Sequence, residues 1–110
     1  MTIKNKVQLV GIVTGVPEIT TLEDGRSRGV INMVTQENYR NQKGEKVQEC
    51  VSHRVVVVGK LATIVDKYVT DEVEIGIEGK IITEQFKDAS GTDRLASEIH
   101  ASELLILSKR

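Results

Sequence analysis

A cysteine and a histidine lie close together in the middle of the chain, where they could hold zinc or form a nucleophile pair. Cys50 is the only cysteine, and His53 follows it by three residues. A structural zinc site takes four ligands, and His100 is the only other obvious soft ligand, so we expect no metal. Residues three apart on a strand point to opposite faces, which defeats proton transfer between Cys50 and His53. The sequence therefore indicates no enzyme and implies no cofactor.

Charge is distributed unevenly along the chain, although its total is close to zero. The formal net charge is −1, which gives no overall electrostatic case for binding nucleic acid. Residues 26–60 nevertheless carry seven basic and three acidic side chains, a local charge of +4, whereas residues 61–110 carry six basic and ten acidic ones, a local charge of −4. We expect a polyanion to meet the first region, with a solvated charged surface as the simpler alternative.

Length and composition predict one globular domain over residues 1–110. Of these 110 residues, 39% are hydrophobic and 28% charged, which is too little apolar surface for two independent cores. No apolar run reaches the roughly 20 residues that a membrane span needs. The first residues also lead into no signal-peptide core, so we expect a cytoplasmic protein without membrane contact.

Periodicity of apolar residues predicts five strands and one helix. A long polar loop is expected over 38–46. From residue 60 apolar side chains recur at i, i+3, i+4 and i+7, which predicts a short helix ending near Val69 with Tyr68 on its buried face. The first two strands are expected to pair as a hairpin. The strands are expected over residues 6–15, 29–37, 47–59, 73–81 and 94–107.

The order of these elements predicts an all-β protein. Three strands, a short helix and two further strands form the order of a five-stranded OB-fold, a Greek-key barrel with its helix between strands three and four. Closing the barrel would remove the exposed edges that such long strands otherwise present.

Motifs along nearly the whole chain resemble those of bacterial single-stranded DNA-binding proteins. They include Asn5-Lys6-Val7-Gln8-Leu9-Val10-Gly11, Glu37-Asn38-Tyr39-Arg40, His53-Arg54-Val55-Val56-Val57-Val58-Gly59-Lys60 and Glu98-Ile99-His100-Ala101-Ser102-Glu103-Leu104. The motifs follow one another in the order found in the family, which is more specific than any one of them alone. The resemblance implies an OB-fold protein that binds single-stranded DNA without sequence preference, in replication, recombination or repair.

The resemblance also implies a site in which aromatic rings stack on bases while basic side chains bind phosphates. Tyr39 and Phe86 occupy aromatic positions of the family, so we expect both to stack. For each basic residue a solvated surface charge is the alternative. The expected phosphate contacts are Arg40, Lys43, Lys46, Arg54 and Lys60.

Several family positions have lost the residue type that binds DNA. Ser52 stands where the family usually has tryptophan, and Val58 where it often has phenylalanine. Ile82 and Glu84 stand where arginines are common. We therefore expect binding that is weak by the standards of the family.

Assembly into a homo-oligomer, with a tetramer as the expected form, is a further implication of the resemblance. The family's histidine at the position of His53 packs at a subunit interface, whereas the alternative for His53 is a hydrogen-bonded core residue within one subunit. Valine and isoleucine lie on both faces of the strands, so a lone barrel would expose apolar surface.

Two other functions stay open at this point. The lost aromatic and basic residues favour an oligomeric OB-fold interaction module that resembles primosomal proteins and has weak affinity for DNA. An OB-fold binder of oligosaccharide or RNA uses the same fold but lacks the collinear motifs. Family members usually continue into a linker with an acidic tip, whereas here the chain stops at Leu107-Ser108-Lys109-Arg110, so we expect no tail-mediated replication partners.

Overall fold

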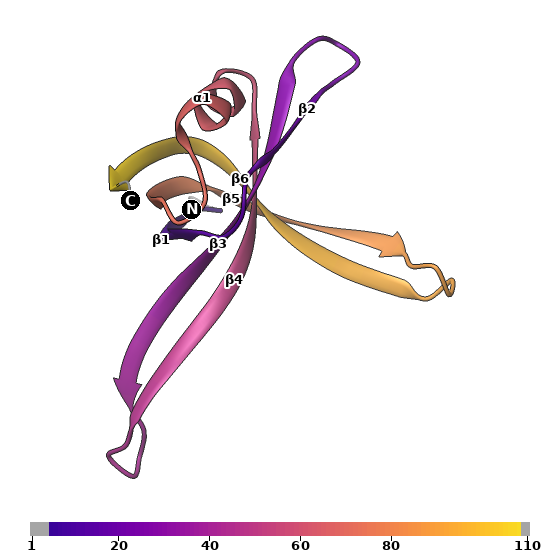
Figure 1. Ribbon diagram of the computed structural model, residues 1–110. Coiled ribbons are helices and arrows are strands. Elements are labelled where there is room, and N and C mark those ends of the chain that lie inside the picture. The colour runs from indigo at the N-terminus through magenta and orange to yellow at the C-terminus, as the bar shows by residue number, and fades with distance from the viewer. Residues whose placement is uncertain (1–4, 109–110) are drawn as a thin grey trace, which may run out of the picture.

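The computed structural model describes residues 5–108, which form a β-barrel with three projecting hairpins (Figure 1). Two successive strands, β1 and β2, pair with β3: β1 reaches Met33 and Val34, and β2 pairs along residues 27–30. Together β1 and β2 take the place of the first barrel strand, which bends between them. In chain order the elements are β1 (Val7–Val13), β2 (Glu18–Thr21), β3 (Ser27–Arg40), β4 (Lys46–Val58), α1 (Lys60–Tyr68), β5 (Glu74–Lys87) and β6 (Asp93–Ser108).

Strand pairing closes the sheet into a barrel. β1 pairs antiparallel with β5, β5 with β6, β4 with β3, and β3 again with β1. The remaining seam joins β4 to β6 in parallel, where Val55 lies opposite Ile99 and Val56 opposite His100. The expected five-stranded OB-fold, with its helix between the third and fourth barrel strands, is confirmed.

Alternate side chains of the barrel strands build the core. Ile31 and Met33 of β3, Val55 and Val57 of β4 and Ile75 of β5 are fully buried. Because successive side chains of a strand point to opposite faces, residues two apart share the barrel interior. The opposite set of side chains, at Asn32 and Arg54 for example, remains on the outside of the barrel.

Helix α1 packs against the barrel, but the residues that it buries differ from those expected. Ala62, Val65 and Val69 are buried, whereas Tyr68 is 49% exposed, so the expectation of a core Tyr68 was wrong. The small side chain of Ala62 lets the helix lie close to β3, where a Cβ on Gly29 would be 3.8 Å from Ala62 Cβ. Among the described residues no helix is long and apolar enough to cross a membrane.

The β3–β4 and β5–β6 hairpins extend well beyond the barrel and point away from each other (Figure 1). The expected loop over 38–46 is shorter in the structure, because only residues 41–45 form the turn while 38–40 and 46 belong to the strands. Asn41 Oδ1 accepts hydrogen bonds from the backbone N–H groups of Lys43 and Glu45, and Gly44 adopts a φ of 78°. The fourth barrel strand likewise continues past the expected end at residue 81, to Lys87. We call these two hairpins the β3–β4 arm and the β5–β6 arm.

A glycine allows the two strands of the β5–β6 hairpin to approach closely at the barrel. The register between β5 and β6 shifts between Glu78 and Gly79. A Cβ on Gly79 would collide with the carbonyl oxygen of His100 and with Ala101 Cα. Only glycine therefore fits this bulge without displacing the backbone.

Candidate nucleic-acid interface

One continuous sheet surface runs from β3 across β4 and β6 onto the β5–β6 arm. Arg54 of β4 lies beside Asn32 of β3, and its Nε donates a hydrogen bond of 2.6 Å to Glu98 Oε2 on β6. Glu98 is in register with Ile82 of β5. Every second residue outward along the arm lies on the same side. We call this surface the outer face, defined by Asn32, Ser52, Arg54, Ile82, Glu84, Phe86, Arg94 and Glu98.

Phe86 lies at the distal end of the outer face. Its side chain is 48% exposed, and its register partner on β6 is Arg94. Exposed aromatic rings on a sheet are suitable platforms for stacking a base. The structure therefore brings Phe86 and Arg54, two of the expected site residues, to the same face.

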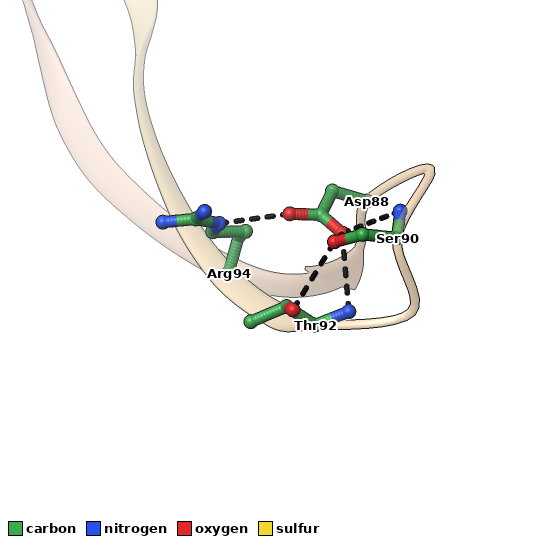
Figure 2. Close-up of polar contacts among 4 residues, drawn as sticks. All are labelled: Asp88, Ser90, Thr92 and Arg94. Carbon is green, nitrogen blue, oxygen red and sulfur yellow. Dashed lines mark hydrogen bonds and ion pairs between the residues drawn. The ribbon is translucent and has the colours of Figure 1, made fainter.

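A network at the end of the β5–β6 arm pairs Arg94, the register partner of Phe86, with Asp88; Figure 2 shows the contacts of Asp88. Asp88 Oδ1 accepts hydrogen bonds from the backbone N–H of Ser90 (3.0 Å), the hydroxyl of Ser90 (2.7 Å) and the backbone N–H of Thr92 (3.1 Å). Asp88 Oδ2 lies 2.9 Å from Arg94 Nε. The Ser90 hydroxyl, followed by the Arg94 guanidinium, lowers the pKa of Asp88 to about 2.

Sequence reasoning missed Arg94. The signal was the spacing: a turn anchored by Asp88 and closed at Thr92 places Arg94 directly across the hairpin from Phe86. The strand expected over 73–81 stops short of Phe86, so it gives no register between Phe86 and Arg94.

Tyr39 lies on the other side of its own hairpin. It is in register with Val47, whereas Asn32 is in register with Arg54. Tyr39 and Asn32 are an odd number of residues apart on β3, so they point to opposite faces of the β3–β4 ribbon. A polymer that contacts both Tyr39 and the outer face must follow the twist of this arm.

The five expected phosphate-binding residues do not form one patch. Arg40, Lys43 and Lys46 gather at the end of the β3–β4 arm, where Arg40 Nη1 donates a 2.9 Å hydrogen bond to the carbonyl oxygen of Gly44. Lys60 begins α1 at the other end of β4. At about 3.3 Å per residue, the length of β4 separates it from that arm end by roughly 40 Å. Arg54 lies between the two ends, at the barrel.

His53 makes a hydrogen bond within the chain. Its Nε2 is 2.9 Å from Thr35 Oγ1, its register partner is Met33, and the residue is half-buried. Cys50 is exposed and lies on the opposite face of β4. Within the described part of the chain, no three histidine, cysteine or acidic side chains are grouped so that they could hold a metal ion.

A second surface, on the outside of β1, β5 and β6, is apolar. Val10, Gly76 and Leu105 are in register across these three strands, and Val10 and Leu105 are 61% and 63% exposed. A shallow depression covers this area. We call Val10, Gly76, Leu105 and Leu107 the apolar face. His53 does not belong to it, since its side chain points to the Thr35 side of the β3–β4 hairpin.

The barrel, its curved outer face and its projecting hairpins define an OB-fold of the kind that binds oligonucleotides or oligosaccharides. The chain matches the model of the single-strand binding protein family over residues 4–107, and it belongs to that family. The resemblance seen in the motifs is thereby confirmed.

Two solved structures share this fold. The Plasmodium falciparum SSB in complex with ssDNA has a TM-score of 0.91 and 24% sequence identity, over 98% of this chain and 98% of that one. A deletion mutant of the single-stranded DNA binding protein from Thermus aquaticus has a TM-score of 0.86 and 20% identity, over 97% of this chain and 52% of that one.

Proposed function

We propose that this protein binds single-stranded DNA without sequence preference along its outer face and its two arms. The observation that carries this proposal is the position of Phe86, an exposed ring on the same sheet surface as Arg54 in a member of the single-strand binding protein family. Stacking accepts any base because every base has a π-face, so the ring supplies affinity without reading sequence.

Basic side chains supply the contacts to phosphate in this proposal. Arg54 uses Nε for Glu98, and the remaining N–H groups of its exposed guanidinium are available to a phosphate. Arg40, Lys43 and Lys46 place positive charge next to Tyr39 at the end of the β3–β4 arm. Lys60 would contact the DNA only if the bound single strand continued along β4 to α1.

Binding should be modest, because the outer face carries few platforms. Ser52, Ile82 and Glu84 share this face with Phe86 and offer neither a ring nor a positive charge. Each stacked base contributes about 1–3 kcal/mol in proteins of this type, so two platforms limit the total. The role that fits is non-catalytic coating of single strands in the cytoplasm, during replication, recombination or repair.

We also propose that the protein assembles into a homotetramer in which the apolar face forms one of the interfaces. Val10, Leu105 and Leu107 form a contiguous exposed apolar area around Gly76, where a Cβ would lie 3.7 Å from both Val10 Cγ2 and Leu107 Cδ1. Such a patch on a small barrel favours contact with a matching surface, and a second copy supplies one by symmetry. His53 would support assembly indirectly, by fixing the β3–β4 arm through Thr35.

An oligomeric interaction module with weak DNA affinity is the second candidate. The observation in its favour is the contrast between the two surfaces, since the outer face has lost platforms while the apolar face exposes Val10, Leu105 and Leu107. This alternative requires the same assembly but no preference for single strands.

Titration of labelled oligothymidine and of a matched duplex, at low and moderate salt, separates the two candidates. We expect tighter binding to the single strand, weakening as salt rises because phosphate contacts release counterions. Binding to neither nucleic acid at low salt would contradict single-strand binding, and the interaction module would be the remaining candidate.

A further inference from the structure

The end of the β5–β6 arm joins a flat ring to a cation whose position is set by the turn. Phe86 and Arg94 are register partners, and such partners in a sheet have Cβ atoms about 4.5–5.5 Å apart. Arg94 is 62% exposed, and its Nε is bound to Asp88 Oδ2. The terminal guanidinium nitrogens remain as a planar pair of donors that suits a phosphate.

Asp88 is itself held in place by hydrogen bonds from other residues of the turn. Three hydrogen bonds from Ser90 and Thr92 converge on Oδ1, which leaves Oδ2 directed at the arginine (Figure 2). Ser90 Oγ also lies 3.2 Å from Thr92 Oγ1, so the two residues that bind Asp88 are hydrogen-bonded to each other. A carboxylate held in this way restricts an arginine side chain that would otherwise sample many rotamers.

The end of the β2–β3 hairpin shows the same ion pair without the ring. Asp24 Oδ2 is 2.7 Å from Arg26 Nε, and Asp24 Oδ1 accepts the backbone N–H of Arg26 at 3.0 Å. Residues 22–26 include no aromatic side chain. The chain therefore contains a matched pair of hairpin ends, and only one of them combines a held arginine with a ring.

We propose that Phe86 and Arg94 form one nucleotide-binding unit, with Asp88 as its positioning residue. Phe86 stacks the base, Arg94 binds a phosphate adjoining that nucleotide, and Asp88 holds the guanidinium in place. The proposal rests on the single-strand binding proposed above and adds a consequence that charge alone does not give. An acidic residue beside the bound DNA strengthens binding.

Comparison of Asp88→Asn with Asp24→Asn tests the role of Asp88. Asparagine keeps an oxygen acceptor for the turn, and each substitution removes one negative charge. If only overall charge mattered, both variants would bind oligothymidine more tightly. We expect Asp88→Asn to bind about 2- to 10-fold more weakly, since Arg94 must then be ordered on binding, while Asp24→Asn binds at least as tightly as the unmodified protein. Equal tightening in the two variants would overturn the positioning role.

A double-mutant cycle tests whether the ring and the arginine act as one unit. We expect Arg94→Gln to lower the slope of log affinity against log salt by about 0.7, the change for one lost phosphate contact on a single strand. Combined with Phe86→Ala, it should weaken binding less than the product of the two separate effects, because both side chains hold the same nucleotide. Arg26→Gln should leave the salt slope unchanged. In the double variant, the fold-changes in affinity of Arg26→Gln and Phe86→Ala should simply multiply.

The outcomes separate this proposal from the one on which it rests. If the unmodified protein fails to bind oligothymidine, both proposals fall. If the protein binds, but the Phe86 and Arg94 effects simply multiply or Arg94→Gln behaves like Arg26→Gln, then the unit does not exist and single-strand binding stands. All five substituted residues lie near hairpin ends, so we expect the barrel to stay intact in each variant, and circular dichroism and urea unfolding check this.

Discussion

Arg54 and Glu98 connect the two strands that close the barrel, with Arg54 Nε 2.6 Å from Glu98 Oε2. They lie on β4 and β6, next to the short parallel pairing of Val55 with Ile99. The hydrogen bond from Arg54, as the largest cause, lowers the pKa of Glu98, and His100 Nε2 lies 3.6 Å from its other oxygen. Two residues of the outer face are thus also part of the seam that closes the fold.

Replacing Glu98 with glutamine should weaken the fold above the acid range. We expect the free energy of unfolding of Glu98→Gln to fall by about 0.2–1 kcal/mol at neutral pH, since Arg54 is half exposed and screened. The pKa of Glu98 is lowered by folding, so its contribution is present above the unfolded value of 4.5 and is lost as pH falls through the folded value. The free energies of unfolding of Glu98→Gln and of the unmodified protein, measured with urea, should become equal at low pH. A difference that persists there would point to packing and not to charge. Glu23→Gln, at the end of the β2–β3 hairpin, is the control.

Asp88 should titrate well below an ordinary aspartate. Its pKa in the folded protein is about 2, against 3.8 for an ordinary aspartate, so the contribution of the carboxylate to the turn is present above 3.8 and is lost as pH falls through about 2. Carboxyl carbon shifts measured by NMR should show this midpoint, and Arg94→Gln should move it upward. A midpoint near 3.8 in the unmodified protein would mean that the turn is not formed in solution.

Gly79 should tolerate no side chain. A methyl group there collides with backbone atoms of His100 and Ala101, which cannot move without breaking the β5–β6 bulge, so we expect Gly79→Ala to cost about 1–3 kcal/mol. Lys80→Ala is the control on the same strand, because Lys80 is exposed, follows Gly79 directly and lies outside the apolar face. Chemical denaturation at one protein concentration compares the two, and equal stabilities would mean that the bulge is not as described.

Charge placed on the apolar face should dissociate the oligomer. We expect Leu105→Lys to shift the mass measured by light scattering from a tetramer towards smaller species, because it buries a cation against a second apolar face. Leu95→Lys is matched in chemistry and lies on the β5–β6 arm, where Leu95 is 74% exposed, and it should leave the mass unchanged. A monomeric unmodified protein at micromolar concentration would contradict the proposed assembly.

Most of the barrel could be predicted from the sequence, because period-two burial in strands such as the one carrying Val55 and Val57 is a strong signal. The length of the arms could not, since beyond the barrel both faces are solvated and residues 38–46 carry no apolar period. The buried face of the helix was predicted wrongly because Tyr68 falls on the apolar period of the sequence. In the structure the small Ala62 determines how closely α1 approaches β3. Arg94 was missed for a related reason, since its importance follows from a cross-strand register and not from local sequence.

A single tryptophan at position 86 tests most directly whether DNA lies on the outer face. The chain contains no tryptophan, so Phe86→Trp introduces the only indole, and stacking with a base should quench its fluorescence. Leu95→Trp is the matched control, because Leu95 lies on the opposite face of the same arm. We expect saturable quenching by oligothymidine at position 86, reversed by salt, and little change at position 95. Quenching at position 95 alone, or binding that leaves the indole at position 86 unchanged, would contradict the placement of single-stranded DNA on this face.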